Sequence, residues 1–152
     1  MISEEGITFE QAVEGVSDSL VLLDVDGTLL PDGGIVITDE TVRAARRLTA
    51  RNKVYLVSNG SDLLRMENFS KLLGIPIATA GVPAGKPSVS ALEGIETKGM
   101  SLVVMGDKHL TDGAFARNIG ARFILIDRKR SGEESGTVRF SYWVDRVVSW
   151  FL

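Results

Sequence analysis

The sequence contains no cysteine, a single histidine and no long hydrophobic run. Without cysteine, the chain has no disulfide, no thiolate nucleophile and no zinc–thiolate site. Because His109 is its only histidine, the chain offers no two-histidine metal site, and any histidine general base would have to be that residue. If the protein is an enzyme, its chemistry therefore depends mainly on carboxylates.

An excess of positive charge and a membrane-spanning segment are absent as well. No apolar stretch approaches the roughly 18–20 residues that cross a membrane, and the acidic, polar N-terminus is unlike a signal peptide. The 17 basic and 20 acidic residues give a net charge of −3, which indicates no nucleic-acid partner. We therefore expect a cytoplasmic protein without a transmembrane segment. Its 152 residues suit one domain that spans residues 1–152.

Apolar segments rich in β-branched residues alternate along the chain with helical patterns. Because these segments are hydrophobic on both faces, they indicate buried strands of a parallel sheet. The main strands are expected at 19–24, 53–58, 101–105 and 122–126, with a shorter edge strand at 75–79. Helices are expected at 38–51, 61–73, 88–95, 112–119 and 142–152, after a short N-terminal helix that begins with a capping box at Thr8. The pattern predicts an α/β fold with a three-layer, Rossmann-like, doubly wound and mainly parallel sheet.

Three segments depart from this alternation or carry unusual residues. Residues 30–37 place a turn between apolar residues, which predicts a small hairpin or flap after the first strand. Near the C-terminus, Trp143, Trp150 and Phe151 are expected to dock on the sheet. Five basic residues lie within residues 43–53, which leaves peripheral contact with a membrane open beside the simpler interpretation of a solvated helix face.

Two aspartates, Asp24 and Asp26, follow the first strand and precede a glycine and a threonine. Alternation along an extended chain places both carboxylates on the same side, at the sheet edge where open α/β proteins bind ligands. Two converging carboxylates repel each other unless a cation or a shared proton offsets the charge. Mg²⁺ suits such a site because it prefers oxygen ligands. Taken alone, the motif is also compatible with an ordinary acidic turn.

Two motifs with the chemistry to bind an anion follow the second strand. Ser58 ends that strand, and Asn59 and Gly60 lead into a helix whose N-terminus favours a negative charge. Further along, Lys86 precedes another expected helix. Each motif has a simple alternative, since the first can be a helix cap and the lysine a solvated charge.

A second acidic pair, Asp107 and Asp112, follows the third main strand. The strand ends thus supply two aspartates, a serine, a lysine and two further aspartates, in this order. This ordered set resembles the motifs of the haloacid dehalogenase (HAD) superfamily, over roughly residues 18–127. The resemblance implies a single HAD-like hydrolase domain, Mg²⁺ as cofactor and phosphoryl transfer through an aspartyl-phosphate.

Within that superfamily, residues 106–112 are similar to those of the small YqeG-type phosphatases, which are related to the mitochondrial phosphatidylglycerophosphate phosphatases. Arg65 and Phe69 add to this likeness. Gly27 and Gly60 depart from it, because that branch tends to have asparagine at both positions. These departures weaken the case for the lipid-phosphate substrate of that branch. They leave the expected phosphoryl-transfer chemistry unchanged.

The resemblance also implies roles for the acidic residues and their neighbours. Asp24 is the expected nucleophile, and Asp26 is the expected general acid and base. Mg²⁺ is expected on the Asp24 carboxylate, the Asp26 carbonyl group and Asp107. Asp112 would orient the water shell of the metal or the motif lysine. Thr28 is expected to shape the turn after the acidic pair and to touch Asp26.

Binding of the substrate phosphate is assigned by the same resemblance to Ser58, Asn59, Gly60 and Lys86. The substrate itself stays unassigned, since small molecules, lipid phosphates and macromolecules all present the same phosphate monoester. HAD-like phosphatases usually select substrates with an inserted cap domain, but the intervals between the motifs are too short to hold one. We therefore expect no cap domain and an open site, which suits a bulky substrate or a homo-oligomer that covers it.

Two alternatives remain beside an enzyme of this type. The first is a receiver-like signalling domain that accepts a phosphoryl group, although an acidic pair on the first strand followed by a later acidic motif argues against it. The second is an inactive HAD-fold binding module, against which the presence of every motif residue argues.

Overall fold

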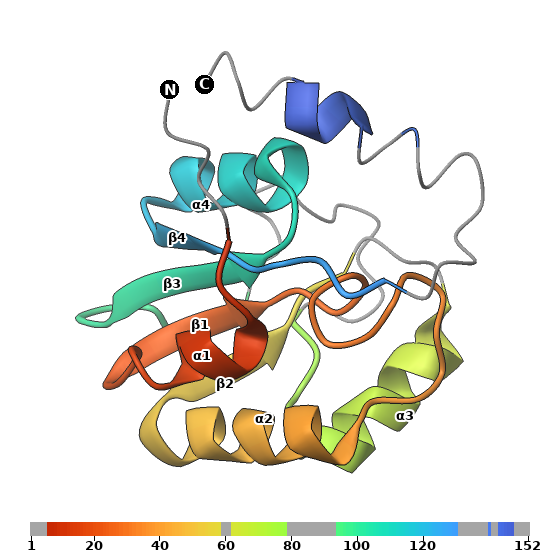
Figure 1. The fold of residues 1–152 in the computed structure, drawn as a ribbon. Coiled ribbons are helices and arrows are strands. Elements are labelled where there is room, and N and C mark those ends of the chain that lie inside the picture. Colours follow the sequence, from red (N-terminus) through yellow and green to blue (C-terminus); the bar gives the residue numbers. More distant parts are fainter. Residues whose placement is uncertain (1–5, 59–61, 79–93, 131–139, 141–142, 148–152) are drawn as a thin grey trace.

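The computed structural model describes residues 6–58, 62–78, 94–130, 140 and 143–147. In this part of the chain, the strands form one sheet in which every neighbouring pair is parallel, in the order β2-β1-β3-β4. The strands are β1 (Ser19–Leu23), β2 (Lys53–Leu56), β3 (Ser101–Gly106) and β4 (Arg122–Leu125). They alternate with helices along the chain (Figure 1), so the predicted α/β Rossmann-like fold is confirmed.

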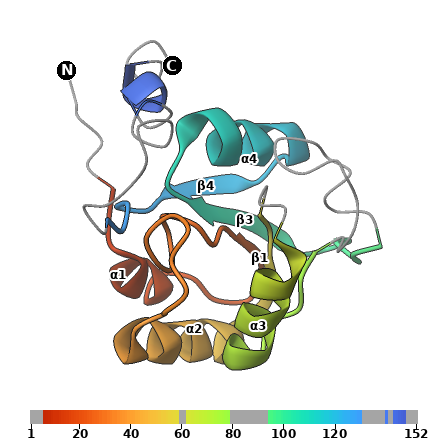
Figure 2. The same ribbon diagram turned by 90° about the vertical axis from the view of Figure 1, so that its right-hand side faces the viewer.

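Helices cover both faces of the sheet, as Figures 1 and 2 show. The helical elements are α1 (Phe9–Val13), α2 (Asp39–Arg51), α3 (Leu63–Leu73), the π-helical turn η2 (His109–Gly113) and α4 (Ala114–Ile119). One hydrophobic core lies under α1, α2 and α3 and includes Phe9, Leu48 and Phe69. The other lies under α4, where Phe115 packs with Leu22 of β1. Two cores separated by one sheet make the three layers that the sequence predicted.

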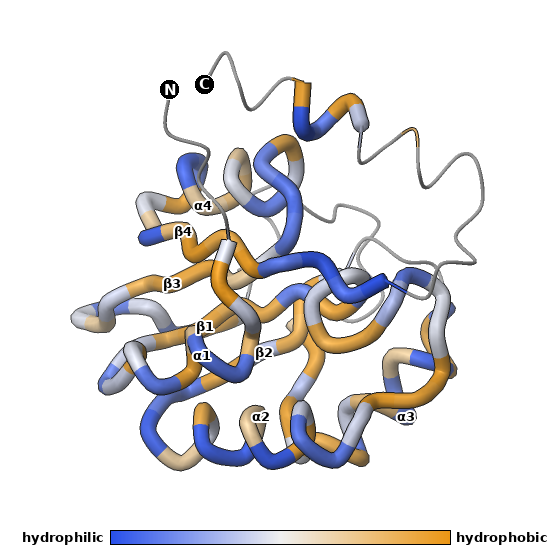
Figure 3. Tube along the Cα trace, viewed as in Figure 1, coloured by the Kyte–Doolittle hydropathy of each residue, from blue (hydrophilic) through white to orange (hydrophobic). Residues whose placement is uncertain are grey.

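The strands are rich in hydrophobic residues (Figure 3), because each face of the sheet carries a core. Every residue of β1 is buried, and hydrogen bonds continue past its end. The Asp24 N–H group donates to the Met105 carbonyl at 2.9 Å, and Val57 N–H donates to the Leu23 carbonyl at 2.9 Å. The central strands therefore stay aligned at the edge where their polar residues begin.

The helix boundaries follow the chemistry of their end residues. Thr8 and Gln11 form the predicted capping box at the start of α1, and the Thr38 side chain caps α2. Gly74 and Gly120 end α3 and α4 in the left-handed conformation, with φ of 68° and 71°. Glycine adopts this conformation at no steric cost, which is why both residues terminate their helices.

Several predicted boundaries differ from the structure. The side chain of Asp62 caps α3 by accepting the Arg65 N–H, whereas the sequence placed the start at residue 61, which lies outside the described residues. The helix expected from Asp112 begins earlier, at His109, because a π-helical turn precedes α4. The helix predicted at 88–95 lies almost wholly outside the described residues. The predicted edge strand at 75–79 is reduced to one bridge between Ile77 and Leu56 in its described part.

Two predictions about exposed segments differ from the structure. Of the hairpin or flap predicted at 30–37, the hairpin does not form: the chain makes turns and an isolated bridge between Asp26 and Leu30 and then runs irregularly to α2. Trp143 does not dock on the sheet, since it is 59% exposed and stacks on Phe140 with ring centroids 5.9 Å apart. Residues 143–147 are helical, in agreement with the predicted C-terminal helix, while Trp150 and Phe151 lie outside the described residues.

The described residues also bear on the cap domain and on membrane insertion. Every residue between Asp24 and Ser58 is described, and this interval holds a loop, α2 and β2 with no inserted domain. Within the described segments, no helix combines the length and the hydrophobicity needed to span a membrane.

Candidate active site

The parallel register brings the polar residues after β1, β2 and β3 to one edge of the sheet. Leu23 pairs with Leu56 on one side and with Met105 on the other. The residues that follow, Asp24 after β1 and Ser58 shortly after β2, therefore emerge at the same edge as the acidic segment after β3. This edge is formed by the carboxyl ends of the strands, where open α/β sheets bind their ligands.

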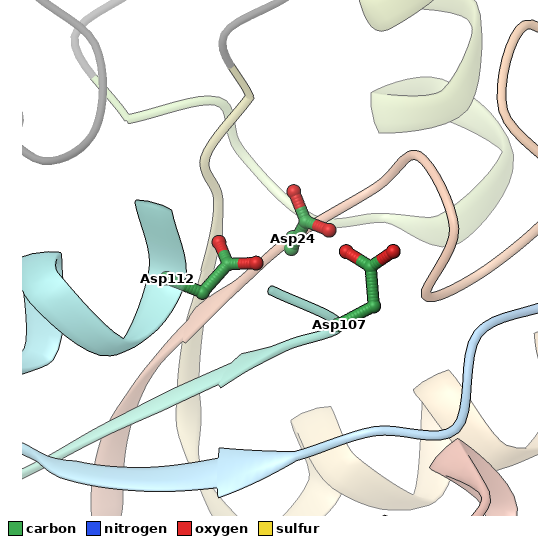
Figure 4. Close-up of side chains that lie close together, drawn as sticks. All are labelled: Asp24, Asp107 and Asp112. Carbon is green, nitrogen blue, oxygen red and sulfur yellow. The ribbon is translucent and has the colours of Figure 1, made fainter. Parts of the chain in front are cut away.

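Three carboxylates from this edge converge. Asp24 follows β1, Asp107 follows β3, and Asp112 lies on η2; one oxygen from each comes within 4.8 Å of the others (Figure 4). All three residues are buried, with exposures of 8%, 9% and 1%. Buried carboxylates this close repel each other strongly, and a hard divalent cation with oxygen ligands removes that cost. The donor set therefore fits a cation such as Mg²⁺.

The turn after β1 holds Asp24 in place through Thr28. The buried Thr28 hydroxyl donates to Asp24 Oδ2 at 2.9 Å. The turn is closed by the Thr28 and Leu29 N–H groups, which both donate to the Val25 carbonyl. Gly27 has φ of 80°, a conformation that suits glycine. The sequence placed Thr28 next to Asp26, and the structure corrects this, because its hydroxyl bonds to Asp24.

Asp112 is hydrogen-bonded within its own turn, and its side chain occupies space that a facing glycine leaves open. The Lys108 N–H donates to Asp112 Oδ2 at 3.2 Å, and the Asp112 N–H donates back to the Lys108 carbonyl at 3.0 Å. A Cβ atom on Gly106 would overlap with the Asp112 carboxyl group. The absence of a side chain at position 106 thus creates the space that Asp112 occupies.

Asp26 points to a different partner. Arg65 Nη2 donates to Asp26 Oδ1 at 2.7 Å and Arg65 Nη1 donates to Asp26 Oδ2 at 3.1 Å, which makes a bidentate ion pair. The Gly33 N–H also donates to Asp26 Oδ1, at 3.1 Å, and Arg65 Nε donates to the Gly34 carbonyl at 2.8 Å. One guanidinium group therefore ties α3 to both Asp26 and the loop that follows it. The guanidinium group also lies over the Phe69 ring, with Cζ 4.9 Å from the ring centroid.

The carboxylates that meet are thus Asp24, Asp107 and Asp112 among the described residues, and the Asp26 side chain is engaged elsewhere. From the sequence, Asp112 is expected to orient the water shell of the metal or the motif lysine, and Asp26 is expected to bind the metal through its carbonyl group. The convergence of the three carboxylates makes Asp112 a further candidate metal ligand. It does not test whether the Asp26 carbonyl group binds the metal.

Three predicted phosphate-binding residues, Asn59, Gly60 and Lys86, lie outside the described residues. Ser58 is described and half-buried, directly after β2. His109 takes no part in the acidic group; its ring packs edge-on against Phe123 with centroids 5.7 Å apart.

Sequence reasoning missed two contributors to the site. In the sequence, Arg65 only adds to the family likeness and has no assigned role, and its contact with Asp26 spans 39 residues. Asp145, from the C-terminal helical segment, accepts the N–H groups of His109 and Leu110 and so holds the start of η2. Neither contact has a local signal, because each joins residues that are distant in the sequence.

The fold and the site together define a Rossmann-like α/β protein with a buried acidic centre that is compatible with phosphoester hydrolysis. The chain is 32% identical to the protein named "Probable phosphatase YqeG" of Bacillus subtilis (strain 168), over 130 residues that cover 84% of this chain and 74% of that protein. The chain belongs to the family of this protein. No family model and no solved structure matches the chain.

Proposed function

We propose that this chain is a Mg²⁺-dependent phosphomonoester hydrolase of the HAD type that works through an aspartyl-phosphate on Asp24. The observation that carries the proposal is the convergence of Asp24, Asp107 and Asp112 at the carboxyl edge of a parallel sheet. The relationship to a probable phosphatase supports the same reaction class. The phosphorylated substrate is the expected partner, and its identity is not part of the proposal.

Asp24, Asp107 and Asp112 supply carboxylates that would hold the ion, and the Asp26 carbonyl is a further candidate. When bound, Mg²⁺ neutralises charge between the nucleophile and the phosphoryl group and orients the substrate. The chain contributes a buried, preformed arrangement of oxygens, with exposures of 9% or less at all three carboxylates. The Thr28 hydroxyl, which donates to Asp24 Oδ2, would keep the Asp24 carboxylate in a fixed orientation.

In the first step, an Asp24 oxygen attacks phosphorus, the bond from phosphorus to the ester oxygen breaks, and Asp26 donates a proton to that leaving oxygen. In the second step, Asp26 takes a proton from water as the water oxygen attacks phosphorus. The bond between Asp24 and phosphorus then breaks, which releases inorganic phosphate and restores both carboxyl groups.

Arg65 would hold Asp26 in a defined position before these proton transfers. The bidentate pair fixes the direction of both Asp26 oxygens, and the Gly33 N–H restrains one of them further. Any movement of Asp26 towards the leaving group has to loosen this pair, so the side chain and the loop at 33–34 would move together. Ser58, Asn59, Gly60 and Lys86 would bind the remaining phosphoryl oxygens, where electrostatic stabilisation has its largest effect.

The test is release of phosphate from p-nitrophenyl phosphate, a generic aryl phosphate, with Mg²⁺ or with EDTA. We expect hydrolysis with Mg²⁺ and none with EDTA. Asp24→Asn should abolish turnover, because an amide is not a nucleophile in this reaction. Asp39→Asn, on the exposed first turn of α2, is the matched control and should keep full activity.

The covalent intermediate can be tested directly. Acid quenching during turnover followed by peptide mass spectrometry should show a phosphoryl group on Asp24. Stable phosphorylation without release of phosphate would favour the receiver-like alternative. Neither phosphorylation nor release, across a panel of phosphate esters, would contradict the proposal and favour a binding module.

A further inference from the structure

The turn that carries Asp112 begins without a side-chain cap from its own residues. Helices leave their first N–H groups without partners inside the helix, and these groups need acceptors. At the start of η2, the N-cap residue is Lys108, whose side chain makes no capping hydrogen bond. The acceptors therefore have to come from elsewhere in the fold.

Asp145 supplies them from the C-terminal helical segment. Its Oδ2 accepts the His109 N–H at 3.0 Å, and its Oδ1 accepts the Leu110 N–H at 2.7 Å. Asp145 is only 5% exposed, so both bonds are formed away from bulk water. A carboxylate at a helix N-terminus also interacts favourably with the aligned backbone dipoles, and its hydrogen bonds are stronger than neutral ones.

The capped turn lies between two carboxylates of the acidic centre. Asp107 precedes its N-cap residue, Lys108, and Asp112 is part of the turn, with the Lys108 N–H bonded to Asp112 Oδ2 at 3.2 Å. A π-helical turn is a rare geometry that occurs often at functional sites and needs support from its surroundings. Asp145 gives that support at His109 and Leu110, two of the four residues between the carboxylates.

We propose that Asp145 is a positioning residue that holds Asp107 and Asp112 at the spacing a divalent cation requires. The inference rests on the metal centre of the proposed function. It goes beyond that function because it assigns a role to a residue on another helix, 36 positions away in the sequence from His109.

A cap with a purely structural role would act differently. Thr38 caps α2, which belongs to the opposite face of the sheet and contributes no carboxylate to the acidic centre. Loss of either cap should lower the stability of the fold. Of these two caps, Asp145 alone fixes the segment with Asp107 and Asp112. Loss of the Asp145 carboxylate should therefore change the affinity of the protein for a metal ion, and loss of the Thr38 cap should not.

The experiment measures binding of Mn²⁺ to the metal-free, full-length protein by electron paramagnetic resonance of the free ion. Asp145→Asn keeps the size of the side chain but replaces one acceptor oxygen with an amide NH2 group, a donor that faces a backbone N–H group. We expect this variant to bind Mn²⁺ about tenfold more weakly, as happens when groups that orient metal ligands are changed. Thr38→Ala and Trp143→Ala, the latter on the same C-terminal segment, should bind Mn²⁺ as the wild type does.

Hydrogen exchange on the metal-free wild type gives a second measurement that needs no variant. The His109 and Leu110 amides should exchange as slowly as those of the central strands, because Asp145 protects them before any metal binds. Fast exchange at both amides would overturn the inference, as would equal Mn²⁺ affinity in the wild type and Asp145→Asn. If the wild type binds no Mn²⁺ at all, the proposed metal centre is wrong. If the wild type binds Mn²⁺ and Asp145→Asn binds it equally well, only the role of Asp145 is wrong.

Discussion

Arg65 joins the acidic site to the loop that follows β1 through one guanidinium group. Its planar fork makes two bonds to Asp26 and one to the Gly34 carbonyl, with Arg65 and Asp26 side chains only 15% and 21% exposed. Lysine keeps the charge but cannot form this bidentate arrangement. We expect Arg65→Lys to lower the free energy of unfolding by about 1–3 kcal/mol. It should also reduce kcat on p-nitrophenyl phosphate by about tenfold, because Asp26 loses its orientation.

The matched control for this prediction is Arg47→Lys. Arg47 pairs with Glu14, and their side chains are 48% and 61% exposed. Exposed ion pairs contribute about 0–1 kcal/mol, so this variant should match the wild type in both stability and kcat. Denaturant unfolding and steady-state kinetics give the two readouts. If Arg65→Lys keeps the kcat of the wild type, the ion pair between Arg65 and Asp26 does not orient a catalytic group.

Gly106 allows Asp112 to approach β3. A Cβ atom at this position would overlap with the Asp112 carboxyl group, so Gly106→Ala has to displace that side chain. We expect a loss of about 1–3 kcal/mol in the free energy of unfolding, typical of an overpacked site. The Mg²⁺ concentration needed for half-maximal activity should rise, since a candidate ligand moves.

Gly113→Ala is the control for this substitution. Gly113 has ordinary helical dihedral angles, and an added Cβ would lie 3.5 Å from the Phe123 ring, a normal contact. Alanine is a better helix former than glycine, so this variant should be as stable as the wild type or more stable, by up to about 1 kcal/mol. An unchanged Mg²⁺ requirement in Gly106→Ala would argue against a role for Asp112 at the metal.

At the scale of elements, Glu10 connects α1, α2 and the segment after β4. It accepts the Thr41 hydroxyl at 2.6 Å and the Lys129 ammonium group at 3.1 Å. The Lys129 N–H donates to the Gly27 carbonyl at 2.7 Å, so this network also supports the turn beside Asp24. Burial raises the pKa of Glu10, but hydrogen bonds from Thr41 and its own backbone, together with Lys129, outweigh it and lower the pKa below the ordinary value.

A lowered pKa makes the contribution of Glu10 dependent on pH. The stabilisation is fully present above the unfolded-state pKa of about 4.3 and is lost as pH falls through the lower folded-state pKa. We expect Glu10→Gln to be about 1–2 kcal/mol less stable than the wild type at pH 7. The difference should shrink below about pH 4.3, and denaturant unfolding across this range measures it. A difference that stays constant down to pH 3 would mean that the carboxylate charge is not its source.

At the scale of the whole molecule, the sheet concentrates negative charge at one edge, through Asp24, Asp107 and Asp112. Without a cation, their repulsion opposes folding. In EDTA, we expect Asp24→Asn to melt higher than the wild type, by ~2–4 °C if about 1 kcal/mol of repulsion is removed. With Mg²⁺, the wild type should gain more stability than the variant, because it keeps a ligand that the variant loses.

Thermal unfolding of both proteins in EDTA and in Mg²⁺ measures these differences. Asp39→Asn is again the control, since Asp39 is exposed and is not part of the group of three carboxylates. The same melting temperature for wild type and Asp24→Asn in EDTA would mean that the cluster carries little repulsion. The absence of any Mg²⁺ effect on the wild type would contradict the metal centre.

Much of the fold could be predicted because its signals are local. Apolar segments predicted the strands of the described sheet, and the capping box at Thr8 predicted the start of α1, since a cap bonds to residues within one turn. The prediction for Trp143 failed because an aromatic residue on a helical pattern does not reveal which face of the helix meets the core. Its helix segment is held to the fold by Asp145 instead, with Trp143 in solvent.

The sequence by itself determined the order of the strands along the chain and the acidic residues that follow them. It also indicated that these residues meet, because parallel strands end at one edge. Only the tertiary structure decided which carboxylates converge, since Asp24 turns to Asp107 and Asp112 while Asp26 turns to Arg65. The physical reason is that side-chain direction beyond a strand end depends on partners distant in the sequence, and strand periodicity stops where the strand does.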